Sequence, residues 1–339
     1  MPETRKLQKI GGTSLYVSLP KDWTRQMQLK QGDQVTLAQQ SDGSMAVHPT
    51  VVPEKPRQIA LEIKAEESGR FLKRRIVAAY VDGFDVIQIE AEKRFTEDQH
   101  DIIREVTEAL FGLEVIEVTS DSITIQCLLT PKLPIEKTFQ RIHNVISSMF
   151  TETISALREH DINLAKSVSK RIQDVERLRL VIYRTLRGSI VFPGAVQQME
   201  MSLMDSVDYL RILHRVTEIA DHVNGIAISV VELGEEAFPD DIQERICETS
   251  GFIRNLYDKS VTALLDQDIQ LANETLDSTL NFEKLWSLCR EADEKSEISS
   301  MALLYAYLLI DNLKEIHRYT TEIAEITIER VEGNMRKEW

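Results

Sequence analysis

The sequence predicts a multidomain protein with a small β-rich head, a small α/β domain and an all-α pair of three-helix bundles. Up to about residue 49, apolar and polar residues alternate at period two. From there to residue 130, segments with a strand pattern take turns with segments that have a helix pattern, and helical periodicity continues afterwards. Prolines at 49–56 and 131–134 mark linkers between these regions. We therefore expect domains at residues 1–50, 57–130, 135–235 and 240–332.

The head is predicted to contain short strands and one helical turn. Residues 14–19 alternate between polar and apolar side chains, as a half-buried strand does, and Pro20 ends this strand and opens the turn. Beyond Gly32, strands at 34–38 and 45–48 flank the turn residues 41–44, which is a hairpin pattern. About fifty residues bury too little apolar surface to be stable alone, so we expect a homodimer.

The middle region is predicted to be a sheet with two helices on one face. Its order is β-α-β-α-β-β, with strands at 58–64, 84–90, 113–118 and 122–128 and helices at 68–80 and 96–111. Thr96 is a suitable N-cap for the second helix. No motif in this region points to a chemistry.

The helical half contains an internal repeat. Asp161-Ile162 and Leu164-Ala165 recur 107 positions later as Asp268-Ile269 and Leu271-Ala272, and a later helix recurs 97 positions on. Two copies of a helix set about 100 residues long are therefore expected. Each copy is predicted to be a three-helix bundle, packed on the other about a pseudo-twofold axis.

Charge is distributed unevenly along the chain. The first 30 residues hold six basic and two acidic side chains, a net charge of +4, whereas the whole chain carries −15 and the remainder therefore −19. A basic end on an acidic chain is typical of a protein that binds a polyanion at that end only. The acidic remainder would repel nucleic acid, so any DNA contact is expected in the head.

Several classes of protein are disfavoured. No apolar run approaches the length of a membrane span and no secretory signal is present, so we expect no membrane insertion. Three distant cysteines suit a reducing compartment, which predicts a cytoplasmic protein. No nucleophile, phosphate-loop or dinucleotide motif occurs, so we expect no enzymatic activity.

The head resembles the AbrB/SpoVT family of swapped-hairpin DNA-binding domains. The resemblance rests on a string of residues in the order and spacing of that family: Lys9-Ile10-Gly11-Gly12, residues 15–19, Pro20-Lys21, Leu29-Lys30, Gly32-Asp33, Val35, Asp42-Gly43 and Pro49. It implies a dimer of interleaved units that presents basic residues to double-stranded DNA. The residues expected to contact DNA are Arg5, Lys6, Lys9, Lys21 and Arg25.

The helical half resembles the PhoU family of phosphate-uptake regulators over roughly residues 135–332. Each copy has the pattern Asp-Ile-x-Leu-Ala, and the last helix of each has two isoleucines seven apart followed by alanine, at 219–227 and 316–324. An AbrB-like head followed by PhoU-like helices looks like the archaeal type of phosphate uptake regulator. The resemblance implies promoter binding by the head, and docking of the acidic body on the ATPase of a phosphate ABC importer.

PhoU relatives can carry iron or zinc on carboxylates spaced four apart, which lie on one helix face about one turn apart. This chain departs from that pattern, because Asp221 matches the second acid of copy one while Thr217 stands at the first. On the first helix of each copy, the alignment leaves only Glu176 and Glu283. The resemblance thus offers an incomplete set of iron or zinc ligands: Glu176, Asp221 and Glu283.

Other residues on the repeated helices have two interpretations each. Lys314 and Arg318, which replace the acids in copy two, either bind an anion or pair with acidic neighbours. His214 and His222 are two turns apart and could share a ligand, although surface or interhelical hydrogen bonding is the better interpretation.

The function predicted from these features is a DNA-binding regulator of phosphate uptake whose helical body senses phosphate status. The alternative is an adaptor that never binds DNA, uses the head only to dimerise, and regulates a phosphate importer by docking on its ATPase.

Overall fold

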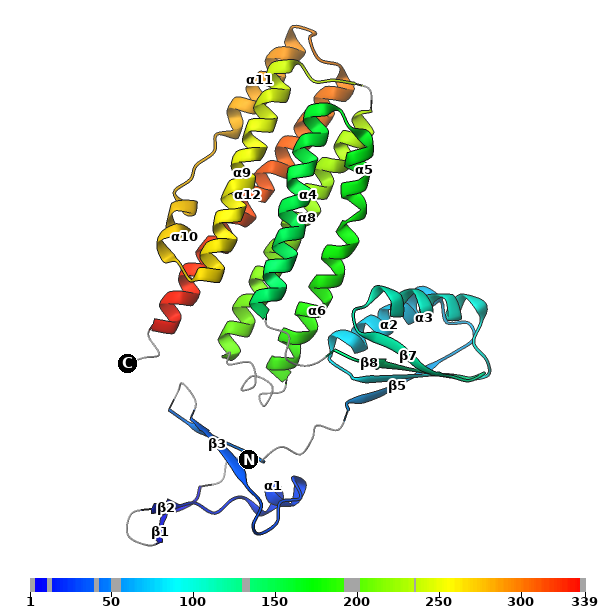
Figure 1. The fold of residues 1–339 in the computed structure, drawn as a ribbon, viewed down its shortest axis with the longest axis vertical. Coiled ribbons are helices and arrows are strands. Elements are labelled where there is room, and N and C mark those ends of the chain that lie inside the picture. The colour runs from blue at the N-terminus through cyan, green and yellow to red at the C-terminus, as the bar shows by residue number, and fades with distance from the viewer. Residues whose placement is uncertain are drawn as a thin grey trace. The chain divides into compact units, whose positions relative to one another are not determined.

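The computed structural model describes residues 4–10, 14–39, 43–49, 56–129, 135–191, 202–234 and 236–335. It has two compact units, Met1–Pro56 and Arg57–Trp339, which we describe separately (Figure 1). The predicted fold class is confirmed: a β-hairpin head, a small α/β region and a mostly helical body. Gly11 and Gly12 of the head motif, the first two residues of the predicted turn at 41–44, and most of both proline linkers lie outside the described residues.

The head consists of two separate antiparallel strand pairs and one short helix. Strand β1 (Gln8–Ile10) pairs with β2 (Ser14–Tyr16), and β3 (Val35–Gln39) pairs with β4 (Met45–Pro49). Helix α1 (Lys21–Gln26) starts after Pro20, as predicted, and buries none of its residues. Strand β2 is shorter than the predicted strand at 14–19, because residues 17–20 run irregularly into α1.

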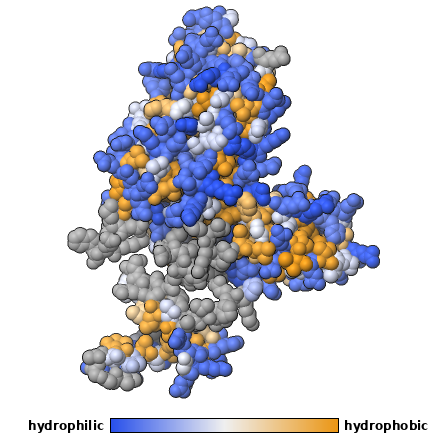
Figure 2. Space-filling view, in the orientation of Figure 1, coloured by the Kyte–Doolittle hydropathy of each residue, from blue (hydrophilic) through white to orange (hydrophobic). Residues whose placement is uncertain are grey.

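The head leaves its apolar side chains on the surface, where Figure 2 shows them in orange. The side chains of Leu7, Leu15, Leu37 and Met45 are each at least 60% exposed. Each exposed side chain forgoes the favourable transfer of its apolar area out of water, about 25 cal/mol per Å². This pattern is what the sequence-based prediction of a homodimer requires, and the dimer stays a prediction.

The α/β region forms one four-stranded sheet in the order β5-β6-β8-β7. Its elements are β5 (Gln58–Ile63), α2 (Gly69–Val81), β6 (Val86–Ala91), α3 (Glu97–Ala109), β7 (Leu113–Val118) and β8 (Ser122–Cys127). Strands β5 and β6 are parallel, the other pairs are antiparallel, and both helices lie on one face (Figure 1). The predicted element order is confirmed, and Thr96 caps α3 through a capping box with Gln99.

The helical body repeats one arrangement twice. The first copy contains α4 (Ile135–Glu159), α5 (Ile162–Lys170), α6 (Ile172–Val191) and α8 (Leu203–Leu233). The second copy contains α9 (Asp240–Asp266), α10 (Ile269–Leu276), α11 (Phe282–Glu294) and α12 (Ser300–Met335). The middle of each copy is thus divided into a short helix and a longer one, where the sequence predicted a single helix.

The repeated Asp-Ile-x-Leu-Ala motif marks this division. His160 and Gln267, which are 107 positions apart, both adopt left-handed backbone angles, with φ of 54° and 56°, and end α4 and α9. The next residue in each copy, Asp161 or Asp268, accepts backbone N–H groups and caps the following short helix. The motif therefore lies after the end of the first helix of each copy and starts a new helix.

The two copies share one hydrophobic core, which runs from α4 to α12. Helices α8 and α12 pack along each other and carry several ion pairs between the copies. Arg211 pairs with Glu329 at 2.7 Å, Arg215 pairs with Glu322, and Arg330 pairs with Asp205 at 3.1 Å. No helix in the described part of the chain has both the length and the apolar character needed to cross a bilayer.

Helix α6 joins the α/β region to the helical body. Arg184 on α6 is 9% exposed, and its guanidinium donates to the carbonyl oxygens of Tyr80 and Phe84 and to the Asp85 carboxylate at 3.0 Å. One turn earlier, Leu180 is part of the α/β core. The docking therefore combines apolar burial with a charged group whose hydrogen bonds come entirely from the other domain.

We predict that Arg184→Ala lowers the free energy of unfolding by about 2–3 kcal/mol, because two carbonyl groups and a carboxylate each lose a charge-assisted hydrogen bond. Arg187→Ala is the matched control on the same helix, since Arg187 pairs with Asp82 where both side chains are nearly half exposed. Its cost should stay below about 1 kcal/mol. Urea unfolding of both variants measures the difference, and equal losses would contradict this account of the junction.

Candidate functional site

The five predicted DNA-contacting residues lie on two neighbouring parts of the head. Arg5, Lys6 and Lys9 lie on or just before β1, and Lys21 and Arg25 are one turn apart on α1. All five side chains are exposed. Their amino and guanidinium groups are therefore accessible to phosphate oxygens without any rearrangement of the head.

A weak polar contact connects the two groups. Arg5 donates to the Ser18 hydroxyl at 3.5 Å, which places the residues before β1 beside the segment that leads into α1. Arg25 lies 3.8 Å from Asp22, and both side chains are more than four-fifths exposed. Such an exposed pair is worth little, so Arg25 can exchange this partner for a phosphate.

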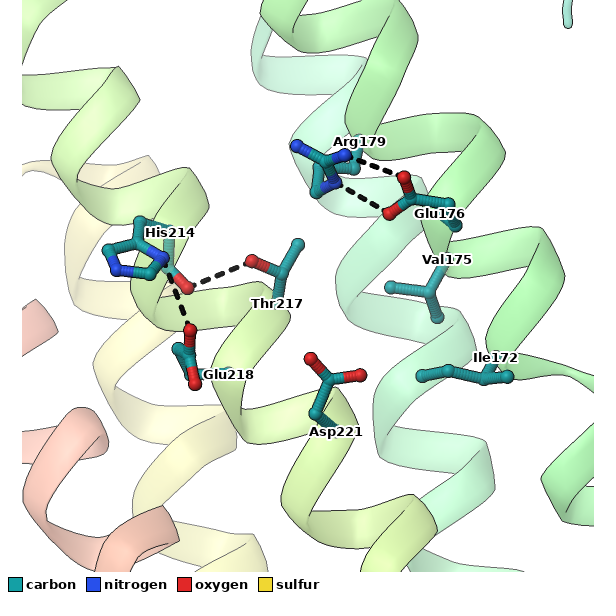
Figure 3. Close-up of a pocket in the computed structure, with 8 residues that line it drawn as sticks. All are labelled: Ile172, Val175, Glu176, Arg179, His214, Thr217, Glu218 and Asp221. Carbon is teal, nitrogen blue, oxygen red and sulfur yellow. Dashed lines mark hydrogen bonds and ion pairs between the residues drawn. The ribbon is translucent and has the colours of Figure 1, made fainter. Parts of the chain in front are cut away.

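A second candidate site is a pocket of about 290 Å³ between α6 and α8. Figure 3 shows its lining: Ile172, Val175, Glu176, Arg179, His214, Thr217, Glu218 and Asp221. Two of the three predicted metal ligands, Glu176 and Asp221, thus meet here. Glu176 belongs to α6, however, and Glu283 to α11, so both lie on the later middle helix of their copies. Their assignment to the first helix was wrong.

A bidentate ion pair engages the Glu176 carboxylate of the pocket. Arg179 donates to both oxygens of Glu176 at 2.6 Å, in the bidentate geometry that guanidinium and carboxylate groups favour. His214 lies 3.4 Å from Glu218 across one helical turn. Thr217 donates its hydroxyl to the carbonyl oxygens of Leu213 and His214, so its proton is directed into the helix.

Asp221 has a perturbed acidity. Partial burial raises the pKa of Asp221, and the nearby carboxylates of Glu218 and Glu176 raise it further, while His222 and Arg179 oppose the change. Sequence reasoning missed Glu218 because it searched for acids four apart, whereas Glu218 and Asp221 are three apart. That spacing also places two side chains on one helix face.

The donor set of this pocket does not fit iron or zinc. Both oxygens of Glu176 are bonded to Arg179, and Thr217 stands where the resemblance requires an acid. Within the residues that the structure describes, no three histidine, cysteine or acidic side chains are grouped so that they could hold a metal ion. Glu283, the third predicted ligand, is an exposed side chain 3.7 Å from Arg290 and lines none of this pocket.

The equivalent positions in the second copy are basic and occupied by other contacts. Arg318 pairs with Glu315 and Glu322, which is the ion-pair alternative that the sequence allowed. The Lys314 ammonium lies 5.5 Å from the Trp286 ring centre. His222 hydrogen-bonds Asn312 at 2.9 Å between α8 and α12, in line with the interhelical role favoured for it.

We predict that Asp221→Asn raises the free energy of unfolding at pH 7, by half a kcal/mol or so because the group is partly solvated. The folded pKa lies above the ordinary 3.8, so ionised Asp221 destabilises the fold above that pH. The increase in the free energy of unfolding should vanish as pH falls below 3.8. Urea unfolding across pH tests this, with exposed Asp311→Asn as the control, and a loss of stability at pH 7 would contradict it.

We also predict that protein purified without chelator contains far less than one iron or zinc per chain. Elemental analysis of the full-length protein measures this directly. A stoichiometric metal content that disappears in Asp221→Asn would show that the Arg179–Glu176 pair opens to admit a cation, and would overturn the conclusion drawn from the donor set.

Comparison with known proteins finds a family match in each of two segments of the chain. Residues 139–230 match the PhoU domain, and residues 8–58 match "Antidote-toxin recognition MazE, bacterial antitoxin". Among solved structures, the phosphate transport system regulatory protein PhoU from Streptococcus pneumoniae aligns at 14% identity and a TM-score of 0.47, over 57% of this chain and 91% of that one. No curated protein matches the sequence. The two domain matches confirm the predicted fusion of a MazE/AbrB-like head to a PhoU-like body.

Proposed function

We propose that this protein is a DNA-binding regulator of phosphate uptake. It acts in the cytoplasm as a homodimer, binds promoters of phosphate-transport genes through its basic head, and senses phosphate status through its helical body. The observation that carries the proposal is the union of the two matched domains in one chain. The sequence has no nucleophile, phosphate-loop or dinucleotide motif, which supports a regulator and not an enzyme.

The charge distribution supports contact with DNA through the head alone. The first 30 residues carry a net charge of +4, and the remaining chain carries −19. Long-range repulsion between the acidic body and the phosphates favours complexes in which only the head approaches the duplex. The exposed apolar residues of the head would be covered by the second chain of the dimer.

A second candidate function follows from the acidic body. In that case the head is only a dimerisation module, and the body docks on the ATPase of a phosphate ABC importer. The exposed apolar residues of the head fit this function equally well. The two functions differ in what they require of the exposed basic side chains, and this difference can be tested.

We predict that full-length protein binds a labelled phosphate-transporter promoter fragment with an affinity that falls steeply with salt, as measured by fluorescence anisotropy. The double variant Lys6→Glu and Lys9→Glu should lower the slope of the salt dependence by about two. The matched control reverses two exposed body lysines, Lys166 and Lys284, and should leave the slope unchanged.

Absence of promoter binding by protein that is folded and dimeric would contradict the transcriptional role. Retention of the importer ATPase in a pull-down by the same preparation would then establish the adaptor. A truncation to residues 51–339 separates the two further, because it should lose DNA and keep the ATPase.

A further inference from the structure

A groove of about 600 Å³ lies between α2 of the α/β region and α6 of the helical body. It is lined by four basic side chains, Arg70, Lys73, Arg74 and Arg179, and by apolar ones. Its volume is within the range of small-molecule sites. The groove lies within the larger unit and shares one lining residue, Arg179, with the pocket between α6 and α8.

The basic side chains of the groove come mainly from one face of α2. Arg70, Lys73 and Arg74 have the spacing i, i+3 and i+4, which places them together on the side towards α6. Helix α2 carries four basic residues and no acidic one, although the chain as a whole has a net charge of −15. Arg75, the fourth, is directed elsewhere and pairs with Glu67 at 3.0 Å.

Two of these cations have no counter-ion among the described residues. Lys73 is paired with Glu105 at 2.7 Å and Arg179 with Glu176, but the exposed side chains of Arg70 and Arg74 make no ion pair or hydrogen bond within the described residues. They lie one turn apart and repel each other. An anion with several oxygens would relieve this repulsion and accept bidentate hydrogen bonds from both guanidinium groups.

The other end of the groove is apolar. Val77, Ala78 and Val81 continue along α2, and Leu180 and Tyr183 face them from α6. Tyr183 is half-buried and packs against both the α/β core and the helical core, so its ring is held in place. A fixed aromatic ring beside aliphatic side chains is a suitable surface for a flat heterocycle.

We infer that this groove binds a nucleoside polyphosphate, with the phosphates at Arg70 and Arg74 and the base against Tyr183. Inorganic phosphate alone would use only the cationic end. Arg179 lines both this groove and the α6–α8 pocket, so a bound phosphate competes with Glu176 for its guanidinium. The role of the groove as an effector site rests on the proposed function, but the binding of a nucleotide to it does not.

Isothermal titration calorimetry of the full-length protein with ATP, AMP and inorganic phosphate tests the inference. ATP should bind saturably and more tightly than AMP or inorganic phosphate. Arg70→Ala and Arg74→Ala should each weaken ATP binding by about tenfold, the loss of one charge-assisted contact. Glu176→Gln should tighten it, because Arg179 is then released to the groove. The control Arg104→Ala, on α3 and paired with Asp101, should have no effect.

Several results would overturn the inference. Absence of saturable ATP binding at millimolar concentration refutes it, as does ATP binding that both groove variants retain while urea unfolding shows them folded. Inorganic phosphate binding as tightly as ATP would refute the role of Tyr183 and the apolar end. Because no DNA is present, ATP binding can succeed while promoter binding fails, or fail while promoter binding succeeds, which keeps the two proposals apart.

Discussion

The buried guanidinium of Arg184 is the interaction on which the arrangement of the larger unit depends. It takes its partners from the α/β region, where it donates to two carbonyl oxygens and one carboxylate and lies 5.1 Å from the Tyr80 ring centre. A charged group with so little exposure is tolerated only when its donors are satisfied. The α/β region is therefore fixed to α6, and a movement of α6 would displace contacts with both the α/β region and the helical body.

Helix α6 consequently lies between two different environments. Towards α8 it contributes Glu176 to a pocket rich in carboxylates, and towards α2 it contributes Leu180 and Tyr183 to a groove rich in arginines. Arg179 lines both. Two sites of opposite charge joined by one side chain give the body a physical means of linking occupancy of the groove to the charge state of the pocket.

Local patterns in the sequence predicted most of the secondary structure. The strand alternation in residues 57–130 and the 107-residue offset between Asp161 and Asp268 gave the element order and the repeat. The same patterns did not show that His160 and Gln267 adopt left-handed angles and divide the middle of each copy into two helices. The contacts of Arg184 are about 100 residues away in sequence, and no local signal reports a contact at that distance.

Some features of the candidate sites could likewise be predicted from the sequence, and others could not. Exposure of the basic head residues could be predicted from composition, and the meeting of Glu176 with Asp221 followed in part from the resemblance to PhoU. The bidentate bond from Arg179, the contribution of Glu218 and the groove between α2 and α6 depend on how separate helices pack.

Chromatin immunoprecipitation under phosphate starvation and phosphate excess tests the central claim most directly. The account predicts enrichment at phosphate-transport promoters that is lost when Lys6 and Lys9 are both changed to Glu. Uniform genome coverage in both conditions would contradict it.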